Sequence, residues 1–378
     1  MTILFISHYS GFYGAAKSML ALILDLRERY RVESIVLLPS HGPLCEELKS
    51  HNIKYYVLHY YWWVNDNKGI FQYLLNKRKQ LLNLFKINRI CKQLENEDID
   101  IVYSNSVTIN IGMFLAKKMK LPHVWHFRES LVQFNASFSL SLSLSKYLLA
   151  QPINSAYIMI SEYMMRYYRS YLPTERMNCI YNGVSLPANI SRVESNVVKK
   201  TLKLASVGVV CEQKNQLELL RALNILKRQN IFVEVYFIGT YKKEYLQLLI
   251  DYVTQFELKD RVHFVGHVEN VWEVLQDMNI GVVCARDEAF GRTTIEFMLM
   301  HMPVIVSNSG ANSELIGEKT GMIYELGDEQ MLASRIESYY NHPKQITSDG
   351  DNAYEHAVKH FSKNQNTDNI YNLIQSIK

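Results

Sequence analysis

One stretch in the second half of the chain, residues 287–310, constrains the fold more than any other. It follows an apolar run, IGVVCA at 280–285, and opens with the turn DEAFG. A helical pattern runs through Glu296 and ends before Met302 and Pro303, and a second apolar run, VIVS, occupies 304–307. A strand, a glycine turn, a helix and a strand form a βαβ unit, in which the glycine turn lies at the carboxyl edge of a parallel sheet. The stretch therefore predicts an open α/β sheet with a ligand site at that edge.

The same alternation of apolar runs and helical patterns continues through the whole chain. Strands that read as unbroken apolar runs are buried on both faces, as in a parallel sheet. The predicted strands of the first half are 3–7, 33–39, 54–60, 100–105, 156–161 and 177–183, together with 122–129, which covers a strand and the loop after it. Those of the second half are 202–210, 233–239, 261–266, 280–285, 304–307 and 321–325. The predicted fold class is therefore α/β, with two doubly wound halves.

The length of 378 residues suits two such domains. The predicted boundary is a polar, unpatterned segment near residues 185–200, which separates an N-terminal domain at 1–185 from a C-terminal domain at 200–352. Residues 353–378 have a helical pattern of their own. The alternating serines and leucines at 137–149 indicate a strand by their period, but their place in the chain fits a helix or a loop equally well.

Composition narrows the classes of function. Apolar residues make up 48% and charged residues 21% of the chain, as in water-soluble globular proteins. The net charge is only +4 and no long basic block occurs, which argues against a nucleic-acid partner. The five cysteines lack C-x-x-C spacing, so neither a disulfide framework nor a zinc site is expected. Because no signal-peptide pattern or bilayer-spanning apolar run is found, we expect a cytoplasmic protein.

Two acidic residues flank the start of the predicted helix in the 287–310 stretch. Glu288 lies in the turn and Glu296 lies in the helix. Acids near a helix start often stabilise the helix dipole, so their spacing alone favours a structural role. Helix amides at this edge of a sheet nevertheless suit a phosphate or a sugar oxygen. Two acids placed here can therefore hold two parts of one ligand.

Three motifs in this region resemble, in order and spacing, the signature of family-4 retaining glycosyltransferases (glycosyl transferases group 1). They are EAFGRTTIE at 288–296, PVI at 303–305 and GANSEL at 310–315. The resemblance implies the GT-B fold, in which two Rossmann-like domains face each other across a cleft. The N-terminal domain is then the acceptor side and the C-terminal domain binds the nucleotide sugar. The helical segment at 353–378 would pack back on the N-terminal domain.

The resemblance also implies roles for the residues of the 287–310 stretch. Glu288 would approach hydroxyls of the donor sugar, and Glu296 would accept hydrogen bonds from ribose hydroxyls. Phe290 and Gly291 would offer backbone amides to the donor. Without the resemblance, an E-x7-E pair at a helix start would favour no ligand.

A second motif, SVGVVCEQKNQ at 206–216, resembles the loop that holds the donor diphosphate in this family. Gly208 and Lys214 match it, whereas Val209 stands where the family has arginine. We expect Lys214 to stabilise the leaving diphosphate, and we hypothesise that Arg292 supplies the missing positive charge. By itself, Lys214 would fit a surface loop equally well.

The first half matches the family less closely. The loop SHYSGFYGAAKSML at 7–20 resembles the glycine-rich loop that faces donor and acceptor, and Gly14 matches, but Tyr13 and Ala16 depart from it. His126 matches the active-site histidine near the donor sugar, although a lone histidine after a strand is more often structural. Asn182-Gly183-Val184 matches a motif near the hinge, where Ser185 replaces an acid.

Together these matches predict transfer of a sugar, with retention, from a UDP- or GDP-linked donor to an acceptor hydroxyl. The acceptor would be a glycan or a lipid-linked glycan in polysaccharide or glycolipid synthesis. Attack from the face of the sugar that the phosphate leaves would need no enzyme nucleophile. Lys214, Arg292 and helix amides would stabilise the leaving phosphate, so no metal is expected. The pair Asp98 and Asp100 leads straight into a strand, so no metal site is inferred there.

Two alternatives stay open. A sugar-nucleotide 2-epimerase uses a similar two-domain frame, and it would alter the donor with no acceptor present. A catalytically weakened partner subunit is the other, because four positions depart from the family pattern: Tyr13, Ala16, Ser185 and Val209.

The segment 55–92 combines aromatic residues with a long helix that carries both leucines and basic residues. The simpler interpretation is a helix packed on the sheet with a solvated basic side. The alternative is an interfacial helix that meets anionic lipid at the inner face of the membrane and presents a lipid-linked acceptor. The sequence is compatible with both.

Overall fold

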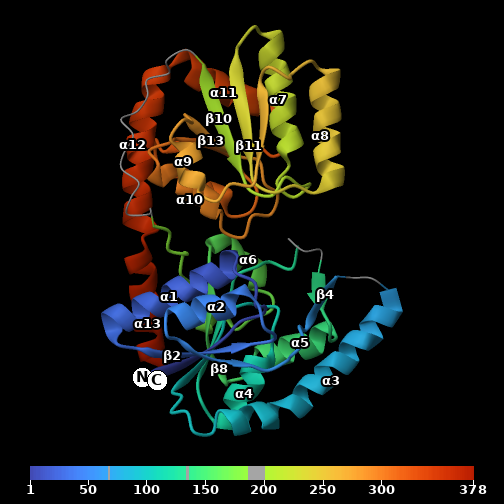
Figure 1. Cartoon of the computed structure of the whole chain (residues 1–378), viewed down its shortest axis with the longest axis vertical. Coiled ribbons are helices and arrows are strands. Elements are labelled where there is room, and N and C mark those ends of the chain that lie inside the picture. The colour runs from blue at the N-terminus through green and yellow to red at the C-terminus, as the bar shows by residue number, and fades with distance from the viewer. Residues whose placement is uncertain (67–68, 133–135, 186–200) are drawn as a thin grey trace. The chain divides into compact units, whose positions relative to one another are not determined.

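The computed structural model describes residues 1–66, 69–132, 136–185 and 201–378, and it divides the chain into two compact units. Unit 1 comprises Met1–Gly183 and Lys363–Lys378, and unit 2 comprises Val184–Ser362 (Figure 1). Each unit is built on its own parallel sheet, so the predicted α/β class of two Rossmann-like domains is confirmed. Apart from Ser185, the predicted boundary lies outside the described residues.

Unit 1 contains a seven-stranded parallel sheet in the order β3-β2-β1-β5-β6-β8-β9. Its strands are β1 (Thr2–Ile6), β2 (Glu33–Leu38), β3 (Lys54–Val57), β5 (Ile101–Ser104), β6 (His123–Phe127), β8 (Asn154–Met159) and β9 (Met177–Cys179). Its helices are α1 (Gly14–Tyr30), α2 (Pro43–Ser50), α3 (Gly69–Gln93), α4 (Ile111–Met119), α5 (Leu142–Leu149), α6 (Glu162–Tyr168), η2 (Thr174–Arg176) and α13 (Lys363–Ile377). The elements follow the predicted order, with helix ends shifted by a few residues.

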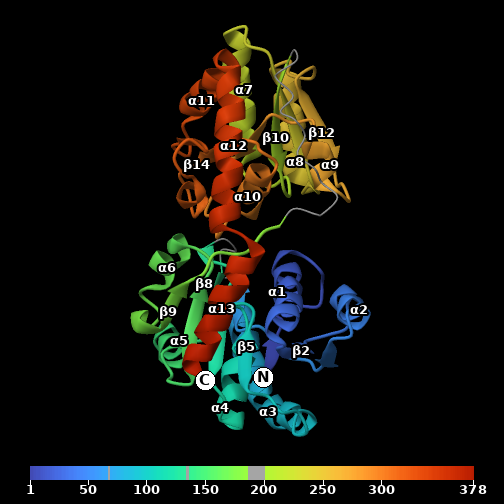
Figure 2. The ribbon, with the colours of Figure 1, turned by 90° about the vertical axis from the view of Figure 1, so that its left-hand side faces the viewer.

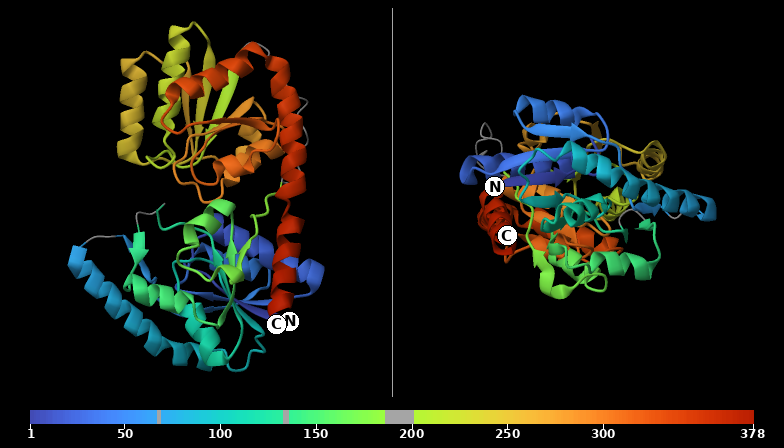
Figure 3. Two further views of the ribbon diagram at one scale, coloured as in Figure 1. Left: turned by 180° about the vertical axis from the view of Figure 1, so that it is seen from behind. Right: turned by 90° about the horizontal axis from the view of Figure 1, so that it is seen from below.

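The central strand β1 shows why this unit is doubly wound. Ile3 and Phe5 point into a core shared with α1, α2 and α13, whereas Leu4 and Ile6 point into a second core shared with α3 and α4. Successive side chains of a strand face opposite ways, so an unbroken apolar run needs helices on both faces. Figure 3 shows these helices on either side of the sheet.

The serine–leucine segment at 137–149 adopts two structures in succession. Its start belongs to β7 (Ala136–Phe138), which pairs antiparallel with β4 (Val64–Asp66). The rest forms α5, whose first turn is capped where the Ser141 hydroxyl accepts a hydrogen bond from the amide of Leu144 at 3.4 Å. A serine in this segment caps a helix, so the serine–leucine alternation does not reflect a single strand. This explains why the period alone did not decide between strand, helix and loop.

Unit 2 contains a six-stranded parallel sheet in the order β12-β11-β10-β13-β14-β15. Its strands are β10 (Leu202–Val207), β11 (Val233–Ile238), β12 (Val262–Gly266), β13 (Ile280–Val283), β14 (Val304–Ser307) and β15 (Gly321–Tyr324). Its helices are α7 (Gln216–Arg228), α8 (Lys243–Gln255), α9 (Val271–Leu275), α10 (Arg292–Leu299), η3 (Asn312–Leu315), α11 (Glu329–Asn341) and α12 (Pro343–His360). In this sheet β13, α10 and β14 form the βαβ unit that the 287–310 stretch predicts.

The C-terminal helical segment is divided between the two units. Residues 353–362 stay with unit 2, because α12 begins at Pro343 and buries Ala353 and Ala357 there. Only α13 lies in unit 1, beside α1 and β8 (Figure 2). The predicted division at residue 352 is therefore ten residues too early, since the helix runs through that point without a break.

In each sheet the chain reverses its winding direction at one position, between β1 and β5 in unit 1 and between β10 and β13 in unit 2. Loops that follow the two strands at such a switch point turn to opposite faces and leave a crevice at the carboxyl edge. Both positions carry residues that the sequence marks out, and the site is built from them.

Candidate active site

The switch point of unit 2 brings Lys214 and Glu288 together. Lys214 follows β10 and Glu288 follows β13, and these strands are neighbours in the sheet. The Lys214 Nζ donates a hydrogen bond to the Glu288 Oε2 at 2.5 Å. Both side chains remain partly exposed, so the ion pair lies where a ligand from solvent can reach it.

Two glycines allow the backbone to close around this pair. Gly208 has φ +134°, which L side chains rarely adopt, and a Cβ there would lie 3.6 Å from the Lys214 Cε. Gly310 has φ +63°, and a Cβ there would come within 2.3 Å of the Glu288 backbone nitrogen. The turn after β14 therefore packs directly on Glu288, where the Ala311 amide donates to the Glu288 carbonyl at 2.7 Å.

Helix α10 begins beside the pair. Gly291 is its N-cap residue with φ +94°, and no acid occupies its first turn. The first amides of a helix have no partner within the helix, so they suit an anion or a sugar oxygen. The Phe290 side chain is buried, so only its backbone is placed to meet a ligand.

Arg292 pairs with Glu296 one turn along α10, where its Nε donates to the Glu296 Oε1 at 2.8 Å. The two predicted donor contacts therefore bind each other. Val209, at the family's arginine position, has an exposed side chain. The proposed compensation for Val209 by Arg292 stays a prediction, and it requires the Arg292 guanidinium to leave Glu296.

A small cavity of about 10 Å³ lies against this arrangement. Its lining includes Ser206, Lys214, Cys284, Glu288, Gly291 and Thr293. Such a volume holds about one water molecule, so a larger ligand needs the ion pair to separate.

A further cation, Arg286, was not singled out by the sequence. It lies two residues before Glu288, and its amide donates to the Gln213 carbonyl at 2.8 Å. Its Nη2 donates to the Asn215 Oδ1 at 3.3 Å. Arg286 thus ties the loop that carries Lys214 to the end of β13 and adds a positive charge near that loop. The sequence feature that could have identified Arg286 is its position directly before the acidic residues of the turn at 287–288.

His126 does not lie after its strand, as the sequence predicted, but within β6 and with no exposed surface. Its Nδ1 lies 2.5 Å from the Tyr103 hydroxyl. Burial, and then the charge of Arg128, holds the pKa of His126 well below its ordinary range. Its predicted contact with a donor sugar stays a prediction, and in this structure the side chain is a neutral part of the core.

The glycine-rich loop of unit 1 leads into α1, which begins at Gly14. A Cβ at Gly14 would meet no atom within 4 Å, so space beside this backbone is open. Tyr13 is exposed and Ala16 is buried in the core. The first turn of α1 therefore offers amides without an acidic side chain.

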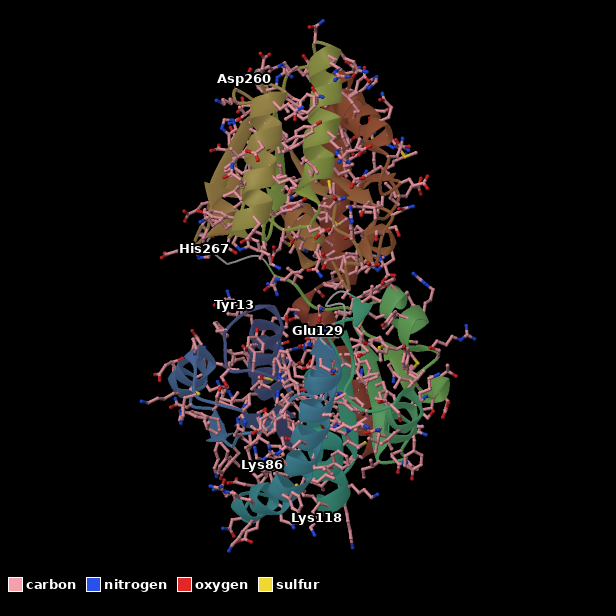
Figure 4. All side chains as sticks on the ribbon, turned by 90° about the vertical axis from the view of Figure 1, so that its right-hand side faces the viewer. Tyr13, Lys86, Lys118, Glu129, Asp260 and His267 are labelled. Atoms are coloured by element: carbon pink, nitrogen blue, oxygen red, sulfur yellow. The ribbon has the colours of Figure 1, made fainter. Side chains whose placement is uncertain are left out.

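The switch point of unit 1 holds a second cavity, of about 350 Å³, which the sequence did not indicate. Its lining comprises His8, Trp62, Val64, Asn65, Thr108, Glu129 and Ala136. Figure 4 shows Glu129 and Tyr13 at one end of unit 1, with Lys86 and Lys118 toward the other. The available signal was the pair Arg128-Glu129 directly after β6.

Glu129 is the acid of this cavity. Its Oε2 accepts a hydrogen bond from the Ser106 hydroxyl at 2.9 Å, and its Oε1 lies 4.0 Å from the His8 Nε2. Burial raises the pKa of the Glu129 carboxyl to about 7, and the Ser106 bond and the Arg128 charge oppose this only in part. Burial, followed by the Arg128 charge, lowers the pKa of His8 to about 3, so His8 is neutral.

Neither a metal cluster nor a membrane span is found in the described part of the chain. No three His, Cys, Asp or Glu side chains of those residues are placed to share a metal ion. None of the helices described is both long enough and apolar enough to cross a bilayer.

Two family models match adjacent parts of the chain. The model named Glycosyltransferase Family 4 matches residues 12–187, and the model named Glycosyl transferases group 1 matches residues 188–356. The junction between them, at 187/188, lies four residues after the change from unit 1 to unit 2 at 183/184.

Curated relatives come from bacterial surface-polysaccharide synthesis. A lipopolysaccharide core mannosyltransferase, LpcC, of Rhizobium leguminosarum bv. viciae is 33% identical over 28% of this chain and 30% of its own. The capsular polysaccharide glycosyltransferase CapM of Staphylococcus aureus is 27% identical over 41% of each chain. CapH of the same species is 24% identical over 71% of this chain and 76% of its own. The chain thus matches less than half the length of the first two relatives.

Solved structures extend the likeness over the whole fold. Anabaena HepE in complex with UDP has a TM-score of 0.79 at 20% identity and covers 100% of both chains. A glycosyltransferase from Rickettsia africae has a TM-score of 0.81 at 17% identity and covers 100% of this chain and 98% of its own. With both family models matched along its length and two parallel-sheet units arranged in sequence, the chain belongs to the family-4, group 1 glycosyltransferases of the GT-B fold.

Proposed function

We propose that the protein is a retaining glycosyltransferase that moves a sugar from a nucleoside-diphosphate donor to an acceptor hydroxyl in polysaccharide or glycolipid synthesis. The observation that carries this proposal is the Lys214–Glu288 pair at the switch point of unit 2, beside the start of α10. The names of CapM, CapH and LpcC support a surface glycan as the product. HepE, which is solved with UDP and with UDP-glucose, supports a UDP-linked donor. GDP is the other nucleotide that we test.

The pair is suited to donor binding because each of its two side chains would bind a different part of the donor. A diphosphate entering the crevice would draw Lys214 away from Glu288, since two negative charges attract the ammonium more strongly than one. Glu288 would then be released to accept hydrogen bonds from sugar hydroxyls. As the glycosidic bond breaks, negative charge grows on the phosphate, and Lys214, Arg286 and the α10 amides would stabilise it without reorganisation.

Retention follows in this proposal from front-face attack. A double displacement needs a carboxylate that attacks the anomeric carbon, and this proposal commits Glu288 to the hydroxyls of the donor sugar instead. The acceptor oxygen would instead bond to the anomeric carbon from the side of the leaving phosphate. The electron pair of the broken bond, and the acceptor proton, would go to that phosphate. The lysine, arginine and amide groups named above supply the charge for this step, and the proposal assigns no metal.

Donor binding is tested by thermal shift with UDP, GDP and their glucose, galactose, mannose and N-acetylglucosamine derivatives. A ligand at a hundred times its dissociation constant adds about 2.7 kcal/mol of stability, a shift that is readily measured. We expect one of the two nucleotides to stabilise the protein and its sugar derivative to do so more strongly. If none of these ligands raises the melting temperature, the proposal is wrong.

Turnover is tested on the donor that binds best. Lys214→Ala should lower kcat by about a hundred- to a thousand-fold, the usual effect of removing a group that stabilises transition-state charge. Lys259→Ala, an exposed lysine of the same unit, is the matched control. An unchanged kcat at saturating donor would remove Lys214 from the chemistry. Incubation with donor alone identifies an epimerase, which would produce an altered sugar nucleotide without any acceptor. A weakened partner subunit would show no transfer by itself even when an acceptor is supplied, so the transferase assay is run alone and with candidate partners.

We further propose that α3 rests on an anionic lipid surface. One face of α3 is packed on the unit, with Asn83, Ile87 and Ile90 buried. The opposite face exposes 58% of Leu74, 59% of Leu81 and 80% of Phe85. The helix carries six lysines and arginines and no acid, so its charge complements phospholipid headgroups. A lipid-linked acceptor would then be presented at the membrane surface.

Vesicle sedimentation tests this contact. We expect binding to vesicles of phosphatidylcholine mixed with phosphatidylglycerol and none to phosphatidylcholine alone, with binding reduced by salt. Phe85→Ser and Leu81→Ser should weaken sedimentation, whereas Leu248→Ser, an exposed leucine of unit 2, should leave it unchanged. Equal failure to sediment with both vesicle types would exclude the contact.

A further inference from the structure

We propose that the cavity at the switch point of unit 1 is a subsite for an uncharged sugar ring of the acceptor, which lies on Trp62 and donates a hydroxyl hydrogen bond to Glu129. This inference rests on the proposed function, since it names the chemistry of the acceptor. Nucleotide binding by the wild type is measured separately from glycoside binding, so that failure of the subsite can be distinguished from failure of the proposed function.

The cavity is a built feature of the fold. His8 follows β1, Thr108 follows β5 and Glu129 follows β6, so three adjacent strands deliver polar side chains to one place. Its volume of about 350 Å³ falls within the range of small-ligand pockets. A crevice at the switch point of an open parallel sheet is also where ligands of such folds bind.

The polar groups of the cavity select for hydroxyls rather than for anions. No lysine or arginine is among the described residues that line it. Its one ionisable acid, Glu129, would repel a phosphate or a carboxylate, and His8 is neutral. Asn65, Thr108 and Glu129 can instead accept or donate the several hydrogen bonds that a polyhydroxylated ring requires.

Trp62 supplies the apolar surface that such a ring needs. Its side chain is 46% exposed, and its indole Nε1 donates to the His8 carbonyl at 2.5 Å. This bond fixes one edge of the indole, so its orientation does not depend on the ligand. An indole joins a large apolar face to a polar edge, and the C–H face of a pyranose can pack on it. A flat apolar ligand would use this face but would add no hydrogen bond to the Glu129 carboxyl.

Glu129 is held in place before any ligand arrives. Ser106 donates to its Oε2 at 2.9 Å, and the Tyr168 hydroxyl donates to its backbone carbonyl at 2.9 Å. A carboxylate fixed in this way accepts stronger hydrogen bonds than a neutral group does. It therefore acts as a positioning residue that selects which acceptor hydroxyl is presented.

Saturation-transfer NMR with full-length protein tests the subsite. The probes are the methyl glycosides of glucose, galactose, mannose and N-acetylglucosamine, with inorganic phosphate competing as the anionic control. We expect at least one glycoside to bind and phosphate not to displace it. Trp62→Ala should reduce that signal at least five-fold, and Glu129→Gln should weaken binding above pH 7 but not at pH 5.5. The matched controls are Tyr340→Ala and Glu175→Gln, two exposed residues outside the cavity.

A second readout guards against simple unfolding of the variants. Each variant is also titrated with the nucleotide that stabilises the wild type, since unit 2 alone carries that site in our proposal. Preserved nucleotide affinity together with lost glycoside binding supports the subsite. Three outcomes would overturn the subsite while leaving nucleotide affinity unchanged. They are glycoside binding that survives both substitutions, displacement of the glycoside by phosphate, and binding of no glycoside. If no nucleotide binds the wild type, the proposed function is overturned instead.

Discussion

Glu129 is a carboxyl that the fold holds at a cost in stability. Its pKa rises from 4.5 to about 7 because folding removes it from water. Between these values the folded chain keeps a proton that the unfolded chain has lost, so stability falls as pH rises through this window. One pKa unit corresponds to about 1.4 kcal/mol, so the cost above pH 7 is on the order of 3 kcal/mol. The surrounding titratable or charged groups are Arg128, His8, Tyr9 and Tyr168.

Glu129→Gln should therefore stabilise unit 1 in a pH-dependent way. We expect a gain of about 2–3 kcal/mol at pH 8.5 and little change at pH 5, because the amide cannot ionise. Urea unfolding followed by tryptophan fluorescence measures it in a Trp272→Phe background, where the remaining tryptophans, Trp62, Trp63 and Trp125, belong to unit 1. A difference between the two proteins that does not vary with pH would contradict the pKa assignment.

The residues of the unit 2 site could be read largely from the sequence, whereas those of unit 1 could not. Lys214 and Glu288 follow strands of strongly patterned βαβ units, so their common edge is predictable. Whether His126 is inside or beyond its strand depends on one or two residues at a strand end, which pattern does not define. The Glu129 cavity depends on side chains from three strands that are remote in sequence. Its members carry no shared motif.

At the scale of elements, the first turn of α1 offers a clean test of the glycine-rich loop. A methyl group added at Gly14 would meet no atom within 4 Å, and the φ of this residue is not in the left-handed region. Gly14→Ala should therefore leave the melting temperature unchanged or raise it slightly, since alanine restricts the unfolded chain. If the backbone of this turn approaches the donor or acceptor, the same variant should lower kcat/KM at least ten-fold.

Differential scanning fluorimetry and steady-state kinetics on the same preparation separate the two effects. Gly327→Ala is an informative comparison, because its site is equally open but its φ of +92° makes alanine strained. That variant should lose stability through backbone strain. A Gly14→Ala enzyme with full activity would show that no ligand needs the space beside this turn.

Element order and type were predictable because apolar runs and helical periods alternate with little ambiguity. Helix ends were predicted less well: the helical pattern that precedes Met302 and Pro303 already ends at Leu299 in α10, because caps rather than periodicity end a helix. The short pairing of β4 with β7 was not foreseen. Its strands are three residues each and far apart in sequence, and such pairs are specified by tertiary contacts.

At the scale of the whole molecule, α13 is the element that unites distant parts of the chain. Ile370 and Ile374 are buried in the same core as α1 and β1. Around them Asp368 pairs with Arg29 at 2.7 Å and Lys363 pairs with Asp25 at 2.9 Å. The helix is therefore part of unit 1 rather than an appendage to unit 2.

Ile374→Ala should destabilise unit 1 by about 2–5 kcal/mol, the usual effect of emptying a buried isoleucine site. Hydrogen exchange followed by mass spectrometry should show faster exchange in peptides of β1 and α1 and unchanged exchange in β10 and α7. Ile336→Ala, at an equally buried site of α11, is the matched control and should give the reverse pattern. Uniform acceleration in both units would show that they unfold as one.

The place of α13 also bears on how the protein is made. Domains usually fold in the order in which the ribosome releases them, with the N-terminal one first. Here Ile370 and Ile374 follow all of unit 2 in the chain, so a nascent unit 1 must wait with part of its core uncovered until unit 2 has been synthesised. Unit 2 can therefore mature first although it is encoded second. During that interval the open core of unit 1 is the surface that chaperones would have to protect.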